Sequence, residues 1–497
     1  MMATCVRAKM LLREPGRSAW EENVAIDVKD GRIAHIDAKV QSSARHLLIP
    51  ALADAHDHGR GLRCTAYGAI DQPLETWLPL LYEAPRTSGY LNTAISLCRL
   101  AHAGVAAVVS CHAVQDADNL HSELVEAARA ANDVGMRLAL VIPLRDRNPL
   151  VYGSVEKLLA CLNPRDRSAV LERWAKPALA PKEQVDRVHE VAECCDSPLV
   201  NVQLGPLAPQ WVSDELFECI AEDSARNGRR IHMHLLETRY QREWADAQYP
   251  QGLLRHLDEL GILCERLTVA HGVWLRPDEM DLLAERRVIV SINTSSNLRL
   301  RSGLAPVREM LRRGVRLAVG IDGFSVDDDD DAGRELRLLR WLHDGPGFAH
   351  GIDLATLWRA ATGVGAEAVT GRADAGALQP GMAADMIAVD WEALSYDAVE
   401  SLADRTELLM ARFGRRYVRD LWVAGRRVVE NGAVVGIDEA TTEAELLARA
   451  RADASRIDHA RPLALRLSSA IERFYSEGYH CARLEAPDSV QLSPQEN

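Results

Sequence analysis

The chain has 497 residues, of which 47% are hydrophobic and 26% are charged, a composition typical of a folded globular protein. Its formal net charge of −14 argues against nucleic acid or an anionic membrane surface as the main partner, because phosphate groups bind to basic surfaces. We find no apolar run long enough to span a bilayer, and we expect no secretory signal at the N-terminus. The ten cysteines include no Cys-x-x-Cys pair, so we expect reduced thiols in a cytoplasmic protein.

The first part of the chain, up to about residue 46, predicts a small β unit. Two strand-like runs, Val24–Val28 and Arg32–Ile36, flank the hairpin turn signal Asp30-Gly31. A segment of this size is too small to bury a core unaided. We therefore expect it to pack against strands from the other end of the chain.

From Leu47 onward, strand-like apolar runs alternate with amphipathic helical patterns, which is typical of an α/β protein with a parallel sheet. The predicted strands are Leu47–Asp54, Val105–Ser110, Arg137–Ile142, Leu199–Gln203, Arg230–Leu235, Leu267–His271, Val288–Ile292 and Arg316–Ile321. The helical patterns between them include His121–Val134, Asp214–Asn227, Gly252–Leu260 and Val307–Arg313. Eight such strands predict a (β/α)8 barrel of the TIM type. The alternative is a doubly wound open sheet, but Gly59-Arg60-Gly61 lacks the third glycine of a nucleotide-binding turn.

Short β runs return after the predicted barrel. One lies within Gly376–Asp390, and others are Asp420–Val423, Arg427–Glu430 and Ala433–Val435. We expect them to complete the sheet begun by the N-terminal segment and to form a small β-sandwich domain. Helical patterns at Glu443–Arg451 and Ala464–Tyr475 follow, and then a polar tail. The predicted domains are a small β domain of residues 1–49 and 377–440, a barrel of residues 50–376, and a C-terminal helical extension of residues 441–497.

Two histidines, His56 and His58, end the first predicted barrel strand. Because side chains alternate along a strand, both imidazoles point to the same face and form half of a transition-metal site. The alternative is a pair of surface histidines in a polar loop. Ionisable groups also end three other predicted strands: His234 with Glu237, then His271, then Asp322. Since barrel enzymes carry their active sites at the carboxyl ends of the strands, the whole set favours a metal site.

A set of motifs extends over nearly the whole chain. The motifs are Ile49-Pro50, Asp54-Ala55-His56-Asp57-His58, Leu74-Glu75-Thr76-Trp77-Leu78, Gly205-Pro206, His234-Leu235-Leu236-Glu237-Thr238, Ala270-His271-Gly272, Ser296-Asn297, Gly320-Ile321-Asp322-Gly323 and Gln379-Pro380-Gly381. With them the chain resembles the amidohydrolase superfamily, and within it the branch of guanine, cytosine and adenosylhomocysteine-type deaminases and triazine hydrolases. The resemblance is specific for the superfamily and says less about the substrate.

By this resemblance, the ligands of one divalent metal per subunit are His56, His58, His234 and Asp322. Three imidazoles and one carboxylate suit Zn²⁺ in the first place, with Fe²⁺ or Mn²⁺ as alternatives. The metal makes water available as a nucleophile near neutral pH. Asp322 is then expected to take the proton of that water.

The same resemblance assigns roles to the neighbouring residues. Glu237 is expected to transfer a proton to the substrate as general acid and base, and His271 is expected to hold the attacking water or the developing oxyanion. His232 is the weaker candidate ligand, because the family ligand is the histidine three residues before the glutamate. The stretch Val200–Gly205 contains neither the lysine nor the glutamate that bridges two metals in the binuclear branch. One metal is therefore expected.

Some positions around this pattern depart from the family. Leu207 and Asn293 stand where relatives commonly carry histidine, and Ile321 stands where they usually carry threonine. Because these positions surround the metal pattern, the departures point to an unusual substrate. The candidate substrate contacts are Arg60, Trp77, His112 and Asn297. The alternative for Arg60 is a solvated charge in a loop, for Trp77 it is packing of a helix, and for His112 it is a structural histidine.

The predicted function is hydrolysis of carbon–nitrogen bonds other than peptide bonds, by deamination of an amino-substituted nitrogen heterocycle. One alternative keeps the site and changes the leaving group to a urea, thiocarbamate, formimidoyl or halo-triazine type. Another is a catalytically silent barrel that serves as a binding protein, although Glu237 and Asp322 argue against it. The acidic run Asp327–Asp331 favours a solvated loop and helix N-terminus over a second cation site. The family resemblance implies a small-molecule substrate and a homodimer or higher homo-oligomer.

Overall fold

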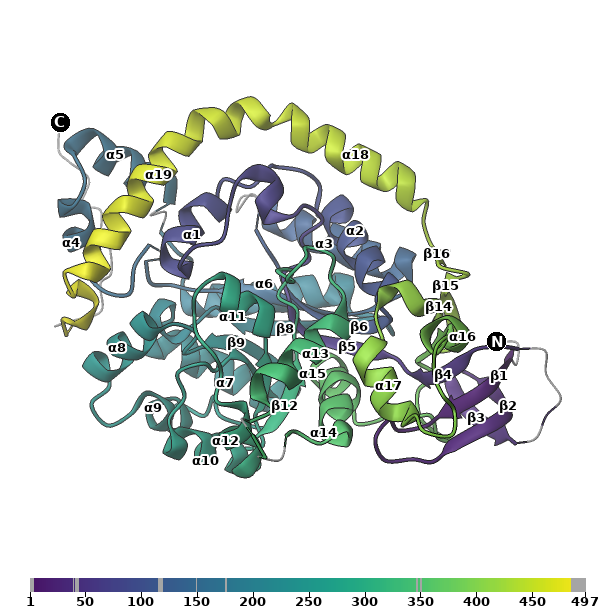
Figure 1. Ribbon diagram of the computed structural model, residues 1–497. Coiled ribbons are helices and arrows are strands. Elements are labelled where there is room, and N and C mark those ends of the chain that lie inside the picture. The colour runs from purple at the N-terminus through teal and green to yellow at the C-terminus, as the bar shows by residue number, and fades with distance from the viewer. Residues whose placement is uncertain are drawn as a thin grey trace.

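The computed structural model describes residues 4–38, 40, 44–114, 119–148, 150–174, 177–345, 347–348 and 351–483, and its strands form two sheets (Figure 1). The first is an eight-stranded parallel sheet in chain order. Its strands are β5 (Leu52–Asp57), β6 (Val105–Cys111), β7 (Arg137–Leu144), β8 (Val200–Pro206), β9 (Ile231–Leu235), β10 (Leu267–His271), β11 (Ile289–Ile292) and β12 (Arg316–Val319). The predicted (β/α)8 barrel is confirmed.

The last strand of the barrel returns to the first. The backbone N–H of Asp322, just after β12, donates to the carbonyl oxygen of His56 in β5 at 2.8 Å. The Asp54 carboxylate accepts from the backbone N–H groups of His56 and Ile321 at 3.1 and 3.0 Å. These contacts bring the carboxyl ends of β5 and β12 together at one end of the barrel.

Amphipathic helices surround the barrel, and their apolar faces cover the strands. Those after β5 to β8 are α1 (Leu74–Leu81), α2 (Gly89–His102), α3 (Leu120–Val134), α4 (Val155–Ala160), α5 (Pro164–Trp174), α6 (Pro181–Cys195) and α7 (Asp214–Asn227). Those after β9 to β12 are α8 (Arg239–Gln248), α9 (Leu253–Glu259), α10 (Pro277–Glu285), α11 (Thr294–Arg299), α12 (Val307–Arg312), α13 (Ala332–His343), α14 (Leu354–Arg359) and α15 (Gly365–Thr370). The helical patterns predicted from the sequence agree with α3, α7, α9 and α12 to within a residue at each end.

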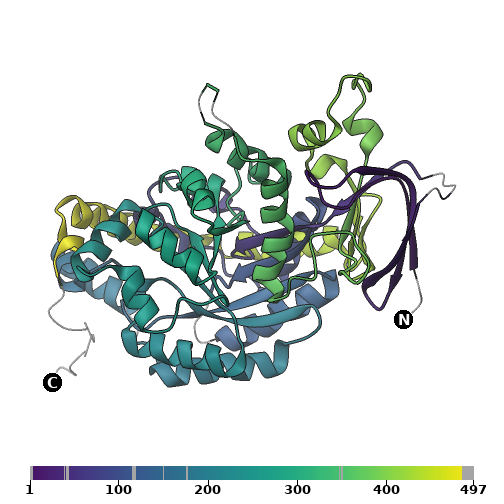
Figure 2. The same cartoon turned by 90° about the horizontal axis from the view of Figure 1, so that it is seen from below.

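The second sheet has the strand order β16-β15-β14-β13-β4-β1-β2-β3. It combines the N-terminal strands with strands that follow the barrel in the chain, and it lies on the side where the N-terminus is marked (Figure 2). Its strands are β1 (Thr4–Leu12), β2 (Trp20–Lys29), β3 (Arg32–Asp37), β4 (Leu47–Pro50), β13 (Met386–Val389), β14 (Val418–Val423), β15 (Arg426–Glu430) and β16 (Ala433–Val434). Helices α16 (Trp391–Leu394) and α17 (Arg405–Arg412) lie between β13 and β14 in the chain. The expected pairing of N- and C-terminal strands in a separate domain is confirmed.

One predicted strand, Leu47–Asp54, is wrong as a single element. It is divided at Ala51 into β4 of the small sheet and β5 of the barrel. The N–H of Ala51 donates to the carbonyl oxygen of Asp385, whereas the N–H of Leu52 donates to that of Gly104 in front of β6. The chain therefore changes sheets over two residues.

A buried ion pair joins the small sheet to the barrel. The Arg137 guanidinium, at the start of β7, donates to both carboxylate oxygens of Asp385 at 2.9 and 3.1 Å. Asp385 also accepts from the N–H of Ala424 in the turn between β14 and β15. This bidentate contact fixes the two sheets relative to one another.

The C-terminal segment forms two helices, α18 (Glu439–Ala452) and α19 (Ala454–Ser476), longer than the predicted patterns. They extend as an arch across one end of the barrel, above α1 and α2 (Figure 1). Ser468 of α19 donates to the carbonyl oxygen of Thr76 in α1 at 2.8 Å, and Arg461 donates to that of Gly68 at 2.8 Å. The predicted polar tail, residues 484–497, lies outside the described residues.

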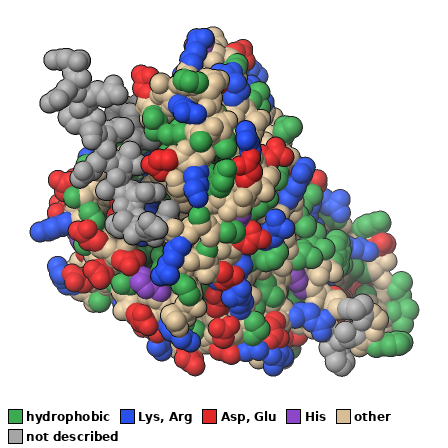
Figure 3. Space-filling view, turned by 90° about the vertical axis from the view of Figure 1, so that its left-hand side faces the viewer, with side chains coloured by type: hydrophobic (Ala, Val, Ile, Leu, Met, Phe, Trp, Pro, Cys, Tyr) green, Lys and Arg blue, Asp and Glu red, His purple; other side chains and the backbone are tan. Residues whose placement is uncertain are grey.

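None of the described helices has the length and apolarity that a membrane span requires. Each of the ten cysteines is a free thiol. On the face drawn in Figure 3, acidic and basic side chains of the described residues are interspersed, so this face presents no continuous basic surface.

Candidate metal centre

Three strand ends bring His56, His58, His234 and Asp322 together at the carboxyl end of the barrel. Oδ1 of Asp322 lies 3.4 Å from Nε2 of His56 and 3.2 Å from Nε2 of His58. The ring of His234 is centred 4.8 Å from that of His56 and 5.5 Å from that of His58. The four side chains named from the sequence thus converge on one point.

Backbone carbonyl groups fix the orientation of two of these rings. Nδ1 of His58 donates to the carbonyl oxygen of Cys111 at 2.9 Å, and Nδ1 of His234 donates to that of Leu207 at 2.8 Å. Each ring therefore keeps Nε2 as the nitrogen with a free lone pair. Burial lowers the pKa of both imidazoles to about 4, so both are neutral, as metal ligands must be, at neutral pH.

His56 carries the clearest sign of a missing ligand. The side chain is fully buried, and its Nε2 has no hydrogen-bond partner among the described residues. An unpaired buried nitrogen is costly, and a metal at this position would use its lone pair. Three neutral imidazoles and one carboxylate are a suitable ligand set for Zn²⁺. The residues present therefore fit the divalent metal that the sequence implies.

Asp322 is held in a conformation that few residues adopt without support, with φ of 65°. Ser296 donates to Oδ2 at 2.5 Å, and Arg60 donates to the backbone oxygen at 2.9 Å. Burial raises the pKa of the Asp322 carboxyl, but the contacts with His56 and His58 outweigh it and hold the pKa well below its usual range. The carboxylate is therefore ionised and able to bind a cation.

Glu237 and His271 lie beside this centre. Oε2 of Glu237 is 3.7 Å from Nε2 of His271, and Oε1 accepts from Ser302 at 3.3 Å. Burial, together with the negative charge of Asp322, raises the pKa of Glu237 well above its usual value. A carboxyl group whose pKa is raised from its usual value holds its proton more tightly and is suited to act as a general acid.

Two further side chains, His232 and Cys111, contact His56. His232 lies behind His56, with its Nε2 2.8 Å from Nδ1 of His56 and the two rings stacked at 5.0 Å. His232 therefore contacts His56 at Nδ1, on the side of the ring opposite to Nε2, the nitrogen proposed to bind the metal. The Cys111 thiol, which the sequence analysis did not single out, lies 3.7 Å from the same Nδ1. Burial raises the pKa of this thiol well above its usual value.

The four candidate substrate contacts occupy different surroundings. Arg60 lies 5.6 Å above the ring of Trp77, which is buried and donates from Nε1 to the carbonyl oxygen of Ala69. Asn297 is buried, and its Oδ1 accepts from Nδ1 of His271 at 2.9 Å.

The last candidate, His112, lies 3.0 Å from Oε2 of Glu123. It also lines a small cavity beside the centre. The other residues lining that cavity are Cys111, Val141, Pro143, Gly205, Pro206, Leu207, His232 and His234. Of the four candidates, Arg60 thus forms a hydrogen bond with Asp322, and Asn297 forms one with His271. His112 lines the cavity that His234 also lines.

The acidic run Asp327–Asp331 includes the expected helix N-terminus, since Asp331 caps α13, but Asp330 and Asp331 are buried and not solvated. Asp330 accepts from Arg63 at 2.6 Å, and Asp331 accepts from the N–H of Gly333 at the start of α13. Asp330 is therefore held by an ion pair, and Asp331 by the start of a helix.

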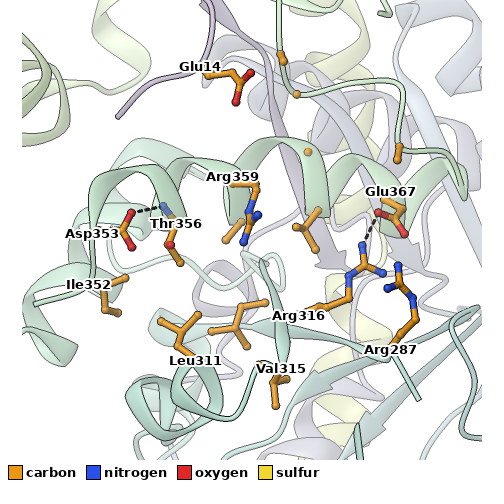
Figure 4. A pocket seen from close by; sticks show the side chains of 18 of the residues that line it. Glu14, Arg287, Leu311, Val315, Arg316, Ile352, Asp353, Thr356, Arg359 and Glu367 are labelled. Carbon is orange, nitrogen blue, oxygen red and sulfur yellow. Dashed lines mark hydrogen bonds and ion pairs between the residues drawn. The ribbon is translucent and has the colours of Figure 1, made fainter. Parts of the chain in front are cut away.

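A larger cavity, of about 1210 Å³, lies at the opposite end of the barrel (Figure 4). Arginine and carboxylate side chains lie together there: Arg316, at the start of β12, pairs with Glu367 at 2.5 Å, and Arg312 pairs with Glu309 at 2.6 Å. None of the imidazoles of the metal centre lines it. Its position at the amino ends of the strands separates it from the chemistry described above.

Comparison with known proteins gives a consistent result. The sequence profile of the amidohydrolase family matches residues 47–428. A 5-methylthioadenosine/S-adenosylhomocysteine deaminase of Pyrococcus furiosus is 30% identical over 349 residues, which cover 68% of this chain and 72% of that protein. An 8-oxoguanine deaminase of Pseudomonas aeruginosa is 28% identical over 86% of this chain and 94% of its own. Among solved structures, an adenosine deaminase of Xanthomonas campestris with bound zinc has a TM-score of 0.75 and 26% identity, covering 92% of this chain and 98% of its own.

Proposed function

The chain belongs to the amidohydrolase family, and from this premise we propose that it is a mononuclear metal-dependent aminohydrolase. It replaces an amino group on a nitrogen heterocycle with hydroxyl and releases ammonia. The similar proteins named above are deaminases of adenosine analogues and of 8-oxoguanine. The observation that carries the proposal is the buried, unpaired Nε2 of His56 at the point where His58, His234 and Asp322 converge.

The four converging side chains hold the metal in this proposal. Zn²⁺ is preferred, since the ligand set suits it and the similar adenosine deaminase contains zinc; Fe²⁺ and Mn²⁺ are the alternatives. When bound, the metal acts as a Lewis acid that brings the pKa of water toward neutrality. One ion per subunit is proposed, because Gln203 and Leu204 of β8 supply no bridging carboxylate or amine.

The chain's own residues then move the protons. Asp322, ionised at neutral pH, accepts a proton from the attacking water. Glu237 starts protonated and donates to the ring nitrogen next to the reacting carbon, which makes that carbon more electrophilic. His271, whose Nδ1–H is held by Asn297, presents the lone pair of Nε2 and accepts a hydrogen bond from the attacking water, which orients that water. Asp322 then passes the proton taken from water to the amino group, which leaves as ammonia, and Glu237 regains a proton from the new hydroxyl group as the carbonyl forms.

The test is a substrate screen with the zinc-loaded protein. Aminopurines, aminopyrimidines, pterins and amino-triazines are incubated with it, and released ammonia is measured together with the mass of the product. The proposal expects ammonia from at least one class and none with the Asp322→Asn variant. Metal retained with no ammonia from any class would contradict deamination. Halo-triazine, thiocarbamate, urea and formimidoyl compounds then test the alternative leaving groups at the same centre.

Three further assignments belong to the proposal. We divide the chain into a small domain of residues 1–49 and 377–440, a barrel of residues 50–376 and a C-terminal extension of residues 441–497, supported by the sheet change at Ala51. A cytoplasmic location is supported by ten free thiols. A homo-oligomer is supported by exposed apolar side chains, among them Trp341, Tyr396 and Leu402. Light scattering at several protein concentrations tests the oligomer.

A further inference from the structure

Glu75 is a buried carboxylate that the proposed reaction does not use. It lies in the first turn of α1, is 4% exposed, and forms no ion pair with a described residue. Burial of a carboxylate without a cation is costly, and the hydrogen bonds that it accepts lead to Glu237. We propose that Glu75 is a positioning residue for Glu237, acting through a buried hydrogen-bond network that Tyr475 of the C-terminal helix completes. This inference rests on the role of Glu237 in the proposed function.

The network begins at Glu75 and ends on the backbone of Glu237. Oε1 of Glu75 accepts from the hydroxyl of Thr238 at 2.5 Å and from that of Tyr152 at 3.1 Å. The Tyr152 oxygen accepts in turn from Nε2 of Gln241 at 3.3 Å, and Oε1 of Gln241 accepts from the N–H of Glu237 at 2.8 Å. Every one of these side chains is buried, so no water competes for the hydrogen bonds.

The segment that carries Glu237 needs such support. Leu236, immediately before it, has φ of 46°, a left-handed conformation that is unfavourable for a leucine. Thr238, immediately after it, caps α8 by accepting from the N–H of Gln241 at 3.3 Å. Because the strained turn persists only where its surroundings fix it, the contacts of Thr238 and Gln241 with the Glu75 network determine where the Glu237 carboxyl lies.

The C-terminal extension belongs to the same network. The hydroxyl of Tyr475, in α19, accepts from the N–H of Tyr152 at 3.1 Å, and the two rings lie 5.4 Å apart. The helix α19 also contacts the backbone of α1 through Ser468 and Thr76, next to Glu75. The arch over the barrel (Figure 1) therefore holds Tyr152 and the backbone beside Glu75 in place.

Four single variants test the inference. Tyr152→Phe removes the hydroxyl between Gln241 and Glu75, Tyr475→Phe removes the acceptor on α19, and Glu75→Gln keeps an acceptor oxygen that Glu75→Ala lacks. Tyr240→Phe is the matched control, because its ring packs 4.7 Å from that of Tyr475 without a hydrogen bond from its hydroxyl to a described residue. Each variant is assayed for kcat, KM, metal content and melting temperature. Backbone amide exchange over residues 236–241 is measured by mass spectrometry.

The network predicts losses in kcat with KM and metal content unchanged, because none of these residues is proposed to touch substrate or metal. A net hydrogen bond of about 1 kcal/mol corresponds to roughly fivefold, so we expect Tyr152→Phe and Tyr475→Phe to lower kcat by at least about fivefold. Glu75→Ala should lose at least about tenfold more than Glu75→Gln, which can still accept from Thr238. Exchange at the Glu237 amide should accelerate by a similar factor in Tyr152→Phe and stay unchanged in Tyr240→Phe.

Two results would overturn the inference. One is kcat within about twofold of the parent in Tyr152→Phe together with unchanged exchange at residues 236–241. The other is an equal loss in Tyr240→Phe, which would show general damage to the aromatic cluster. If the parent protein deaminates nothing, the proposed function fails, and the exchange measurement still decides whether the network holds Glu237. If Glu75→Ala does not fold, Glu75→Gln and the two phenylalanine variants decide.

Discussion

Replacing Glu237 by glutamine tests the proposed proton transfer most severely. The glutamine side chain has nearly the same shape, and its oxygen can still accept from Ser302, which donates to Oε1 of Glu237 at 3.3 Å. It has no carboxyl proton to donate toward the substrate beside His271, 3.7 Å away. A positioned acid or base contributes about 10²- to 10⁴-fold in rate, which corresponds to about 2.7–5.5 kcal/mol of transition-state stabilisation. We expect kcat to fall by at least about a hundredfold, with metal content unchanged.

The fold should survive this change. Burial raises the pKa of Glu237, and a neutral amide of nearly the same shape replaces the side chain without adding a charge. Steady-state ammonia release, metal analysis and circular dichroism are measured on the same preparation. Glu243→Gln, in the helix α8 that follows Glu237, is the control, since its carboxylate lies 2.8 Å from Nε2 of His480. Turnover of Glu237→Gln within about tenfold of the parent would remove Glu237 from the mechanism.

Three other changes have defined outcomes. Asp322→Asn should abolish measurable turnover while circular dichroism shows an intact fold, because the amide cannot accept the water proton. Burial raises the pKa of Glu335 from 4.5 to about 7. The unfolding free energy of the parent should therefore fall, relative to that of Glu335→Gln, by at most about 3 kcal/mol as the pH rises from 4.5 through 7. Melting temperatures of the two proteins that depend on pH in parallel would contradict this. Asp385→Ala leaves Arg137 buried without its carboxylate and should cost about 3–5 kcal/mol in urea unfolding; a loss below about 1 kcal/mol would show that the pair is dispensable.

The barrel strands were predictable because each is a short apolar run closed by polar residues. Val105–Ser110, Leu267–His271 and Arg316–Ile321 agree with β6, β10 and β12 to within two residues at each end. The division of the first run at Ala51 was not predictable, since Leu47–Asp54 is continuously apolar up to its last residue. The change of sheet depends on hydrogen bonds to Asp385 and Gly104, which are distant in sequence.

The convergence of the imidazoles was also predictable, because parallel strands deliver their ends to one edge and His56, His234 and Asp322 all stand at such ends. The buried residues that hold the site in position were not predictable. Glu75 lies within a motif taken as a family signature, and its partner Tyr152 lies in a loop without a pattern. They meet because α1 and the arch of α19 fold over the barrel, and no local spacing in the sequence encodes that contact.

The central claim, that one divalent metal lies among four strand-end side chains, is tested most directly by X-ray diffraction at the zinc absorption edge on crystals of the zinc-loaded protein. The account predicts one anomalous peak per chain, about 2.0–2.2 Å from Nε2 of His56, His58 and His234 and from a carboxylate oxygen of Asp322. Density without an anomalous peak among these groups, or a peak bound only elsewhere on the chain, would contradict it.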